Sequence, residues 1–208
     1  MTASDRDHLG TLRAIISEWL RAIIGIRTYV NQSGSDNAFT SKQHDGASIR
    51  SLAYQSGNGN TVTLDQSGIT SSAYTDQSGN NNVSKMTIAG NNGNVGSYYD
   101  SSAYQPGVRQ SGNSNTSKVS YLATDSHGAV SSSTTFNVGQ TGNFNGSTIT
   151  RGGTDNNAQL LQGGNYNTSG ITQDGSTNTA NVMQMSDYNT STISQIGTNS
   201  SATVTQGH

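Results

Sequence analysis

The chain has 208 residues, of which only 29% are hydrophobic and 11% are charged, and its formal net charge at pH 7 is −2. An average globular domain is nearly half apolar and about a quarter charged, so the composition disfavours an enzyme with a thick hydrophobic core. The lack of a basic surface argues against nucleic-acid binding, and the absence of cysteine excludes disulfides and zinc–thiolate sites. No apolar run reaches the about 20 residues of a transmembrane span.

The first segment, residues 1–25, differs in composition from the rest and predicts an amphipathic helix. Its apolar residues between positions 9 and 24 recur at helical spacing, and Gly25 follows them. Glu18 and Arg21 interrupt the apolar stretch, so the segment lacks the pattern of a secretory signal peptide. We expect this helix to dock on the following domain and cap it, and attachment to a membrane surface is the alternative.

The second segment, residues 26–208, is a repeat domain in which glutamine recurs mostly at multiples of 11 residues. Glycine often follows the glutamine position by two residues, and asparagine often precedes it by six. We expect all three residue types to be structural. The glutamines are Gln32, Gln43, Gln55, Gln66, Gln77, Gln110, Gln140, Gln162, Gln173, Gln184, Gln195 and Gln206. The glycines are Gly34, Gly57, Gly68, Gly79, Gly112, Gly142, Gly153, Gly164, Gly175 and Gly197. The asparagines are Asn37, Asn60, Asn82, Asn115, Asn145, Asn156, Asn167, Asn178 and Asn189.

The pattern within one unit has a period of two and predicts a strand followed by a tight corner. Asparagine, a small residue, an aliphatic residue and glutamine stand at alternate positions, which is one face of a strand. Glycine then supplies the positive φ that a corner needs. A right-handed coiled coil can also have an 11-residue repeat, but Gly and Asn in every unit oppose a helix.

Alternate units carry different residues, so the full repeat has 22 residues and contains two strands. One kind of unit has Ser and Ile at its inner positions, and the other has Ala with Leu or Val. The sequence therefore predicts an all-β fold, a two-sheeted β-solenoid with coils of about 22 residues. The expected apolar seam between the sheets consists of Ile149, Leu160, Ile171, Val182, Ile193 and Val204. Stacked Asn and Gln side chains are expected to hydrogen-bond to the same residue type one coil away.

The repeat is degenerate around residues 82–132. Ile88, Tyr99 and Tyr121 take glutamine positions, and Pro106 takes an inward position where it would break a rung. Arg151 takes another glutamine position. Counting every position in this grid predicts about 17 half-coils, or roughly eight coils.

The doubled unit Asn-x-small-x-aliphatic-x-Gln-x-Gly resembles the curlin repeat, as in residues 167–178 (NTSGITQDGSTN). The match is best over residues 134–207, good over 28–80 and weak over 82–132. Curlins are the subunits of curli, the functional amyloid fibres of bacterial biofilms. The resemblance implies a structural subunit that polymerises with copies of itself into an extracellular cross-β fibre on the bacterial cell surface. It also implies a nucleator subunit, a secretion pore and chaperones as further partners, and the inward Asn and Gln as the key residues.

Three functions stay open on the sequence. The first is the bulk fibre subunit, and the second is a specialised curli nucleator. The third is a monomeric ice-binding solenoid, because outward threonines such as Thr148, Thr150 and Thr192 recur. We expect the neighbouring rungs to lack this pattern and to read Gln105, Gly107 and Arg109, or Val83, Lys85 and Thr87. Enzyme activity and cofactors are not expected, since the four histidines show no metal-ligand spacing. The last unit, residues 200–206, contains no charge, so we expect an edge that is open to another chain.

Overall fold

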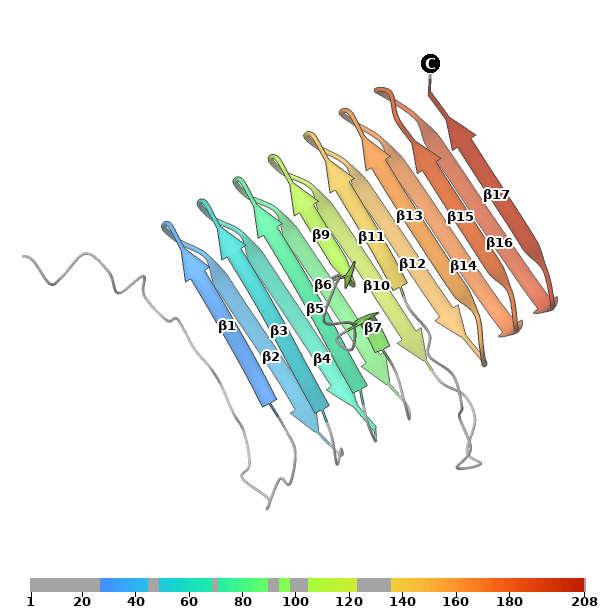
Figure 1. Ribbon diagram of the computed structural model, residues 1–208, viewed down its shortest axis with the longest axis horizontal. Coiled ribbons are helices and arrows are strands. Elements are labelled where there is room, and N and C mark those ends of the chain that lie inside the picture. Colours follow the sequence, from blue (N-terminus) through green and yellow to red (C-terminus); the bar gives the residue numbers. More distant parts are fainter. Residues whose placement is uncertain are drawn as a thin grey trace, which may run out of the picture.

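A computed structural model of the protein describes residues 27–44, 49–68, 71–89, 94–97, 105–122 and 136–207. The chain winds as a flat coil in which successive strands alternate between two parallel sheets (Figure 1). This arrangement confirms the all-β, two-sheeted solenoid that the repeat predicts. The amphipathic helix expected over residues 1–25 lies outside the described residues.

The first sheet contains ten strands, eight of which follow one continuous path. In spatial order these are β1 (Arg27–Ser33), β3 (Ile49–Ser56), β5 (Ser71–Ser78), β9 (Val108–Ser111), β11 (Phe136–Thr141), β13 (Asn157–Gly163), β15 (Thr179–Gln184) and β17 (Ser201–Gln206). The second sheet contains seven strands. They are β2 (Ala38–His44), β4 (Thr61–Ser67), β6 (Val83–Ala89), β10 (Thr116–Leu122), β12 (Gly146–Gly152), β14 (Thr168–Ser176) and β16 (Thr190–Thr198).

The strands pair in the register that aligns like residues of successive coils. Ile149 of β12 lies beside Ile171 of β14, which lies beside Ile193 of β16. A shift by one residue would turn every inward side chain outward, so a single buried face is enough to fix this register. The sheet of β16 therefore contains the Ser and Ile units, and the facing sheet contains the Ala and Leu or Val units.

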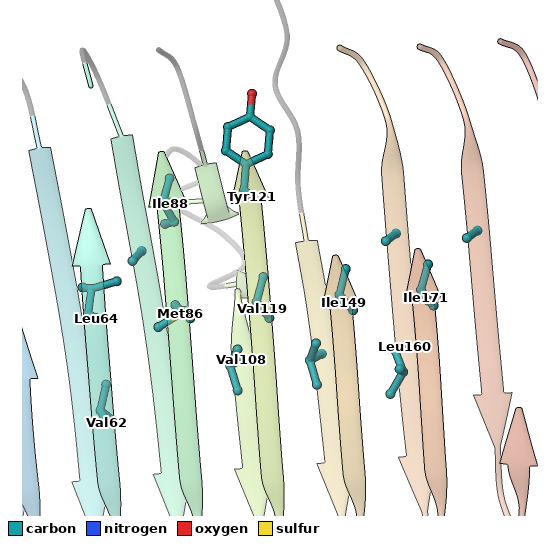
Figure 2. Close-up of a cluster of buried hydrophobic side chains, with 14 of the residues drawn as sticks. Val62, Leu64, Met86, Ile88, Val108, Val119, Tyr121, Ile149, Leu160 and Ile171 are labelled. Atoms are coloured by element: carbon teal, nitrogen blue, oxygen red, sulfur yellow. The ribbon is translucent and has the colours of Figure 1, made fainter. Parts of the chain in front are cut away.

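The hydrophobic core is a seam of inward side chains between the two sheets (Figure 2). Ile149, Leu160 and Ile171 are fully buried there, whereas Val204 on the last strand is only half-buried. Burial of a whole aliphatic side chain contributes about 1.5–3 kcal/mol. The apolar residues therefore stabilise the fold although they are few, because nearly all of the inward ones are buried.

The corners depend on glycine because successive coils approach closely there. Gly142 has φ +106°, and a Cβ at this position would lie 2.1 Å from the carbonyl oxygen of Gly164 in the next coil. The ten glycines two positions after the glutamine slots all have positive φ. The fourth residue after the slot also has positive φ, even where it is an aromatic residue such as Phe144 at 56°.

The degenerate middle differs from the expected grid. Gln77 and Gln110 are 33 residues apart in sequence, yet β5 pairs directly with β9, so this distance spans one coil with an insertion. The insertion contains β7 (Asn94–Ser97) and β8 (Gln105–Pro106), which pair with each other in antiparallel fashion and both lie off the continuous path of the sheet. Pro106 is therefore outside the main ladder, which agrees with the expectation that it would break the strand pairing. Tyr99 lies outside the described residues. The expected count of about 17 half-coils is wrong, since the continuous paths hold eight and seven strands.

Candidate functional site: the stacked amide columns

The glutamines of the eight-stranded path form one continuous column through the solenoid. The Nε2 atom of each glutamine donates a hydrogen bond to Oε1 of the glutamine in the next coil, over 2.9 Å from Gln140 to Gln162. The column runs through Gln32, Gln55, Gln77, Gln110, Gln140, Gln162, Gln184 and Gln206. It therefore also passes without a break through the coils that hold the insertions.

The column glutamines after Gln32 also tie the two sheets together. Besides its bond to Gln162, Nε2 of Gln140 donates to the carbonyl oxygen of Thr116 on the facing sheet, over 3.1 Å, and to that of Asn145. Gln162 likewise donates to the carbonyl oxygen of Gly146. Buried amides are costly unless they are paired, and here both ends of the amide have partners. The column thus satisfies polar groups that a purely apolar seam would leave unpaired.

The column of the seven-stranded sheet is interrupted at its centre. Gln43 donates to Gln66 at one end, over 3.0 Å, and Gln173 donates to Gln195 at the other, over 2.9 Å. Between these two pairs the same position is occupied by Ile88, Tyr121 and Arg151, all of which are buried. Figure 2 shows Ile88 and Tyr121 toward the same end of their neighbouring strands.

Arg151 is a buried cation in this interruption. Its guanidinium carbon lies 4.9 Å from the centroid of the Tyr121 ring, a cation–π contact that offsets part of the cost of burial. Desolvation lowers the pKa of Arg151 to about 10, and it also raises the pKa of Tyr121. Oε1 of Gln173, one coil further on, is buried and accepts no hydrogen bond from any described residue.

Replacing Arg151 with glutamine is expected to stabilise the fold. The Arg151→Gln variant removes a buried charge and supplies an amide that can donate to Oε1 of Gln173. We expect the free energy of unfolding of the freshly purified monomer to rise by about 1–3 kcal/mol, measured by guanidinium titration. Arg109→Gln is the control, because Arg109 is exposed and its ion pair with Asp76 spans 3.9 Å; we expect a change below about 1 kcal/mol.

The pH dependence of this gain follows from the lowered pKa of Arg151. Below about pH 10 the guanidinium is charged in both the folded and the unfolded chain, so the full cost of burial is present. Above that pH the folded chain loses the proton first, and the cost falls as the pH rises. The gain should therefore be constant between about pH 6 and 9. A gain that changes across this range, or a loss of stability, would contradict the assignment.

The asparagines bind backbone groups of the neighbouring coil at the corners. Oδ1 of Asn145 accepts the backbone N–H of Asn167 over 3.0 Å, and Nδ2 of Asn145 donates to the carbonyl oxygen of Gly164 over 2.8 Å. Seven asparagines stack in this way at one corner, namely Asn37, Asn60, Asn82, Asn115, Asn145, Asn167 and Asn189. The opposite corner stacks Asn156 and Asn178, followed by Ser200. The two corners were not distinguished by the sequence argument.

A second, outer set of corner residues was missed by that argument. Asn143 Nδ2 donates to Oδ1 of Asn165, and Asn165 Nδ2 donates to a carboxylate oxygen of Asp187. Beside this ladder the rings of Phe144, Tyr166 and Tyr188 stack with centroids 4.9 and 5.1 Å apart. The signal was present in the sequence, since these residues also recur every 22 positions.

The outward threonines have only part of the neighbours that the sequence suggested. The rung beside Thr148 and Thr150 is β10, which presents Lys118 and Ser120, so the expected Gln105, Gly107 and Arg109 were wrong. The other expected set, Val83, Lys85 and Thr87, does lie in this sheet, one strand further on in β6, where Lys85 follows Lys118 in the same column. Two adjacent lysines therefore interrupt the threonine array. Among the described residues, no group of three or more potential metal ligands occurs.

The last two strands carry no charged side chain. β16 and β17 consist of the sequences TSTISQIGT and SATVTQ, and no described strand covers their outer edges. Ala202 and Val204 of β17 are partly buried and pack against the core. In the part of the chain that the structure describes, no helix is long and apolar enough to cross a membrane.

Comparison with known proteins yields one family. The family model described as the curlin-associated repeat matches residues 153–185 and 178–207. These matches cover β13 to β17, where the two inward columns are most regular. No curated protein and no solved structure matches the chain.

Proposed function

We propose that this chain is the bulk subunit of an extracellular fibre. It is a curlin-repeat protein, and its solenoid fits a curli-like amyloid subunit. In this role copies of the chain self-assemble on the bacterial cell surface, and the fibre serves the biofilm matrix and adhesion. Curlins are structural subunits, so the site is an assembly surface and no reaction is assigned to it. Nucleator, secretion pore and chaperones are proposed partners on the same basis.

The observation that carries this proposal is the state of the terminal rungs. β16 and β17 are uncharged, and their outer edges expose backbone donors and acceptors that no described strand pairs. Monomeric β proteins usually cover such edges, twist them or place charges on them, because an open edge recruits further strands. An open edge on a stack of identical rungs therefore favours templated addition of another chain.

The alternatives receive less support. The continuous glutamine column through the degenerate middle favours a bulk subunit over a specialised nucleator. Ice binding requires a flat, regular array, and Lys85 and Lys118 break the threonine columns.

The test is fibre formation by the purified chain. We expect incubation at neutral pH to give fibres with a cross-β reflection at about 4.7–4.8 Å, recorded by fibre diffraction. A reflection at about 10 Å should report the spacing of the two sheets. A chain that stays monomeric and gives no such reflection after weeks would refute the fibre function and leave the solenoid fold unaffected.

A further inference from the structure

The two ends of the solenoid carry complementary halves of the glutamine columns. At each step the earlier glutamine donates and the later one accepts, as from Gln162 to Gln184. At the last rung Gln195 and Gln206 each donate to one carbonyl of the facing sheet, and no described residue accepts their second amide hydrogen. At the first rung Oε1 of Gln32 accepts no hydrogen bond from the described residues. One end thus offers donors and the other an acceptor, which suits head-to-tail contact between two copies.

The numbers of strands in the two sheets then restrict how these ends can meet. The described residues form eight strands on one path and seven on the other, so the described ladder begins and ends in the same sheet. If a second copy were added by translation alone, β1 of the second copy would pair with β17 of the first. One strand position would then stay empty between β16 of the first copy and β2 of the second. The two facing strand edges would then stay unpaired, at the cost of several backbone hydrogen bonds.

Rotation removes this gap. If the second copy turns by half a revolution about the solenoid axis, its β1 pairs with β16 of the first copy and its β2 pairs with β17 of the first copy. Strand directions also agree, because the two sheets of a solenoid run in opposite directions and the half-turn exchanges them. Every strand edge between the two copies is then paired.

We propose that successive copies of this chain stack head to tail with a half-turn between them, so that each sheet of the fibre continues into the opposite sheet of the next copy. This geometry rests on the proposed fibre function and adds to it. With seven and a half coils of about 4.8 Å each, it gives a rise of about 36 Å per copy and a repeat of about 72 Å.

The two kinds of half-coil are similar enough for this exchange. In both corners the fourth residue after the glutamine slot has positive φ, as in Thr177 after Gln173 and Tyr188 after Gln184. Both corners use glycine at the second position in most coils. Asparagine stands at the fifth position throughout one corner, whereas the regular coils of the other corner have Asn156, Asn178 and Ser200 there. A half-coil from either sheet can therefore be followed by one of either kind.

Gly197, the corner glycine of the last rung, fits the proposed contact between two copies. A Cβ on Gly175 would lie 2.0 Å from the carbonyl oxygen of Gly197, whereas a Cβ on Gly197 would meet nothing within 4 Å. The half-turn places Gly34 of the next copy over Gly197, so glycine again meets glycine. The same register places Gln32 of the next copy over Gln195. The half-turn thus supplies an acceptor for Gln195 and a glycine opposite Gly197.

Cysteine pairs distinguish the half-turn from simple translation. The chain has no cysteine, and Asn31, Ser194 and Thr205 are exposed residues that directly precede glutamine slots. The half-turn brings Asn31 of one copy beside Ser194 of another, whereas translation brings it beside Thr205. Directly opposed residues on adjacent strands are close enough for a disulfide.

Fibres are assembled from each double variant under reducing conditions and then oxidised. We expect Asn31→Cys/Ser194→Cys fibres to give a ladder of covalent oligomers on a non-reducing gel, and Asn31→Cys/Thr205→Cys fibres to give none. The reverse result, or no ladder from either, would overturn the half-turn while the fibre function stands. Absence of fibres from the unmodified chain would refute the fibre function itself.

A second variant probes the same junction without a cross-link. Gly197→Ala places a Cβ where the half-turn puts the carbonyl oxygen of Gly34 from the next copy. We expect the monomer to keep its β-sheet circular dichroism, and elongation on preformed seeds to slow by about tenfold or more, followed by light scattering. Thr198→Ala, at the next and exposed position, is the control. Unchanged elongation by Gly197→Ala would contradict the proposed contact.

Discussion

Gly142→Ala is expected to destabilise the solenoid by about 4 kcal/mol, which combines backbone strain and overpacking. The reason is geometric, because the new Cβ would lie 2.1 Å from the carbonyl oxygen of Gly164 and the residue would have to keep φ +106°. Neither atom belongs to a flexible side chain, so the corner can relax only by separating two coils. Separation would lengthen the bond from Asn145 to the same carbonyl oxygen, now 2.8 Å.

The measurement is guanidinium unfolding of the monomer, with Gly170→Ala as the matched control. Gly170 lies within β14, and a Cβ there would meet nothing within 4 Å. Alanine has less backbone freedom than glycine in the unfolded chain, so the control should be neutral or slightly stabilising. Equal effects of the two substitutions would show that close approach of the corners is not what requires glycine.

Gln140→Leu is expected to cost about 2–4 kcal/mol of unfolding free energy, although leucine has a similar size and is more hydrophobic. The substitution leaves Nε2 of Gln110 without its acceptor and Oε1 of Gln162 without its donor. It also frees the carbonyl oxygen of Thr116 on the facing sheet. The two glutamine groups are buried, and an unpaired buried polar group costs about 1–3 kcal/mol.

Gln159→Leu is the control for this experiment, because Gln159 on β13 points outward and is exposed. We expect its effect to stay within about 0.5 kcal/mol. Thermal or guanidinium unfolding of the monomers, followed by circular dichroism, provides the comparison. If Gln140→Leu were as stable as the control variant, the column would be a consequence of the fold and would contribute little to its stability.

The strands and their inward faces could be predicted from the sequence because they depend on local patterns. Alternation around Ile149 and Leu160 marks one buried face of each strand, and the 22-residue repeat marks two sheets. The family resemblance could be stated for the same reason, since it rests on the spacing of Gln173, Gly175 and Asn178. The amide columns follow once identical residues are stacked.

The middle of the chain could not be read in the same way. Counting by 11 assigned a rung to Tyr99, whereas the structure pairs Thr75 of β5 directly with Val108 of β9. Spacing in sequence cannot distinguish a rung from an insertion of similar length, because only strand pairing shows which residues are neighbours. The outward neighbours of Thr148 were wrong for the same reason.

The sequence by itself determined the repeating unit, the inward residues and the need for glycine at the corners, because each depends on backbone geometry and on a local period. Only the tertiary structure decided that the described ladder holds eight strands in one sheet and seven in the other. It also placed the buried Arg151 over Tyr121, in the middle of a column whose two ends consist of glutamine. Both features arise from pairing between segments far apart in the chain. Such pairing is set by the hydrogen bonds and packing of whole coils, which no single repeat specifies.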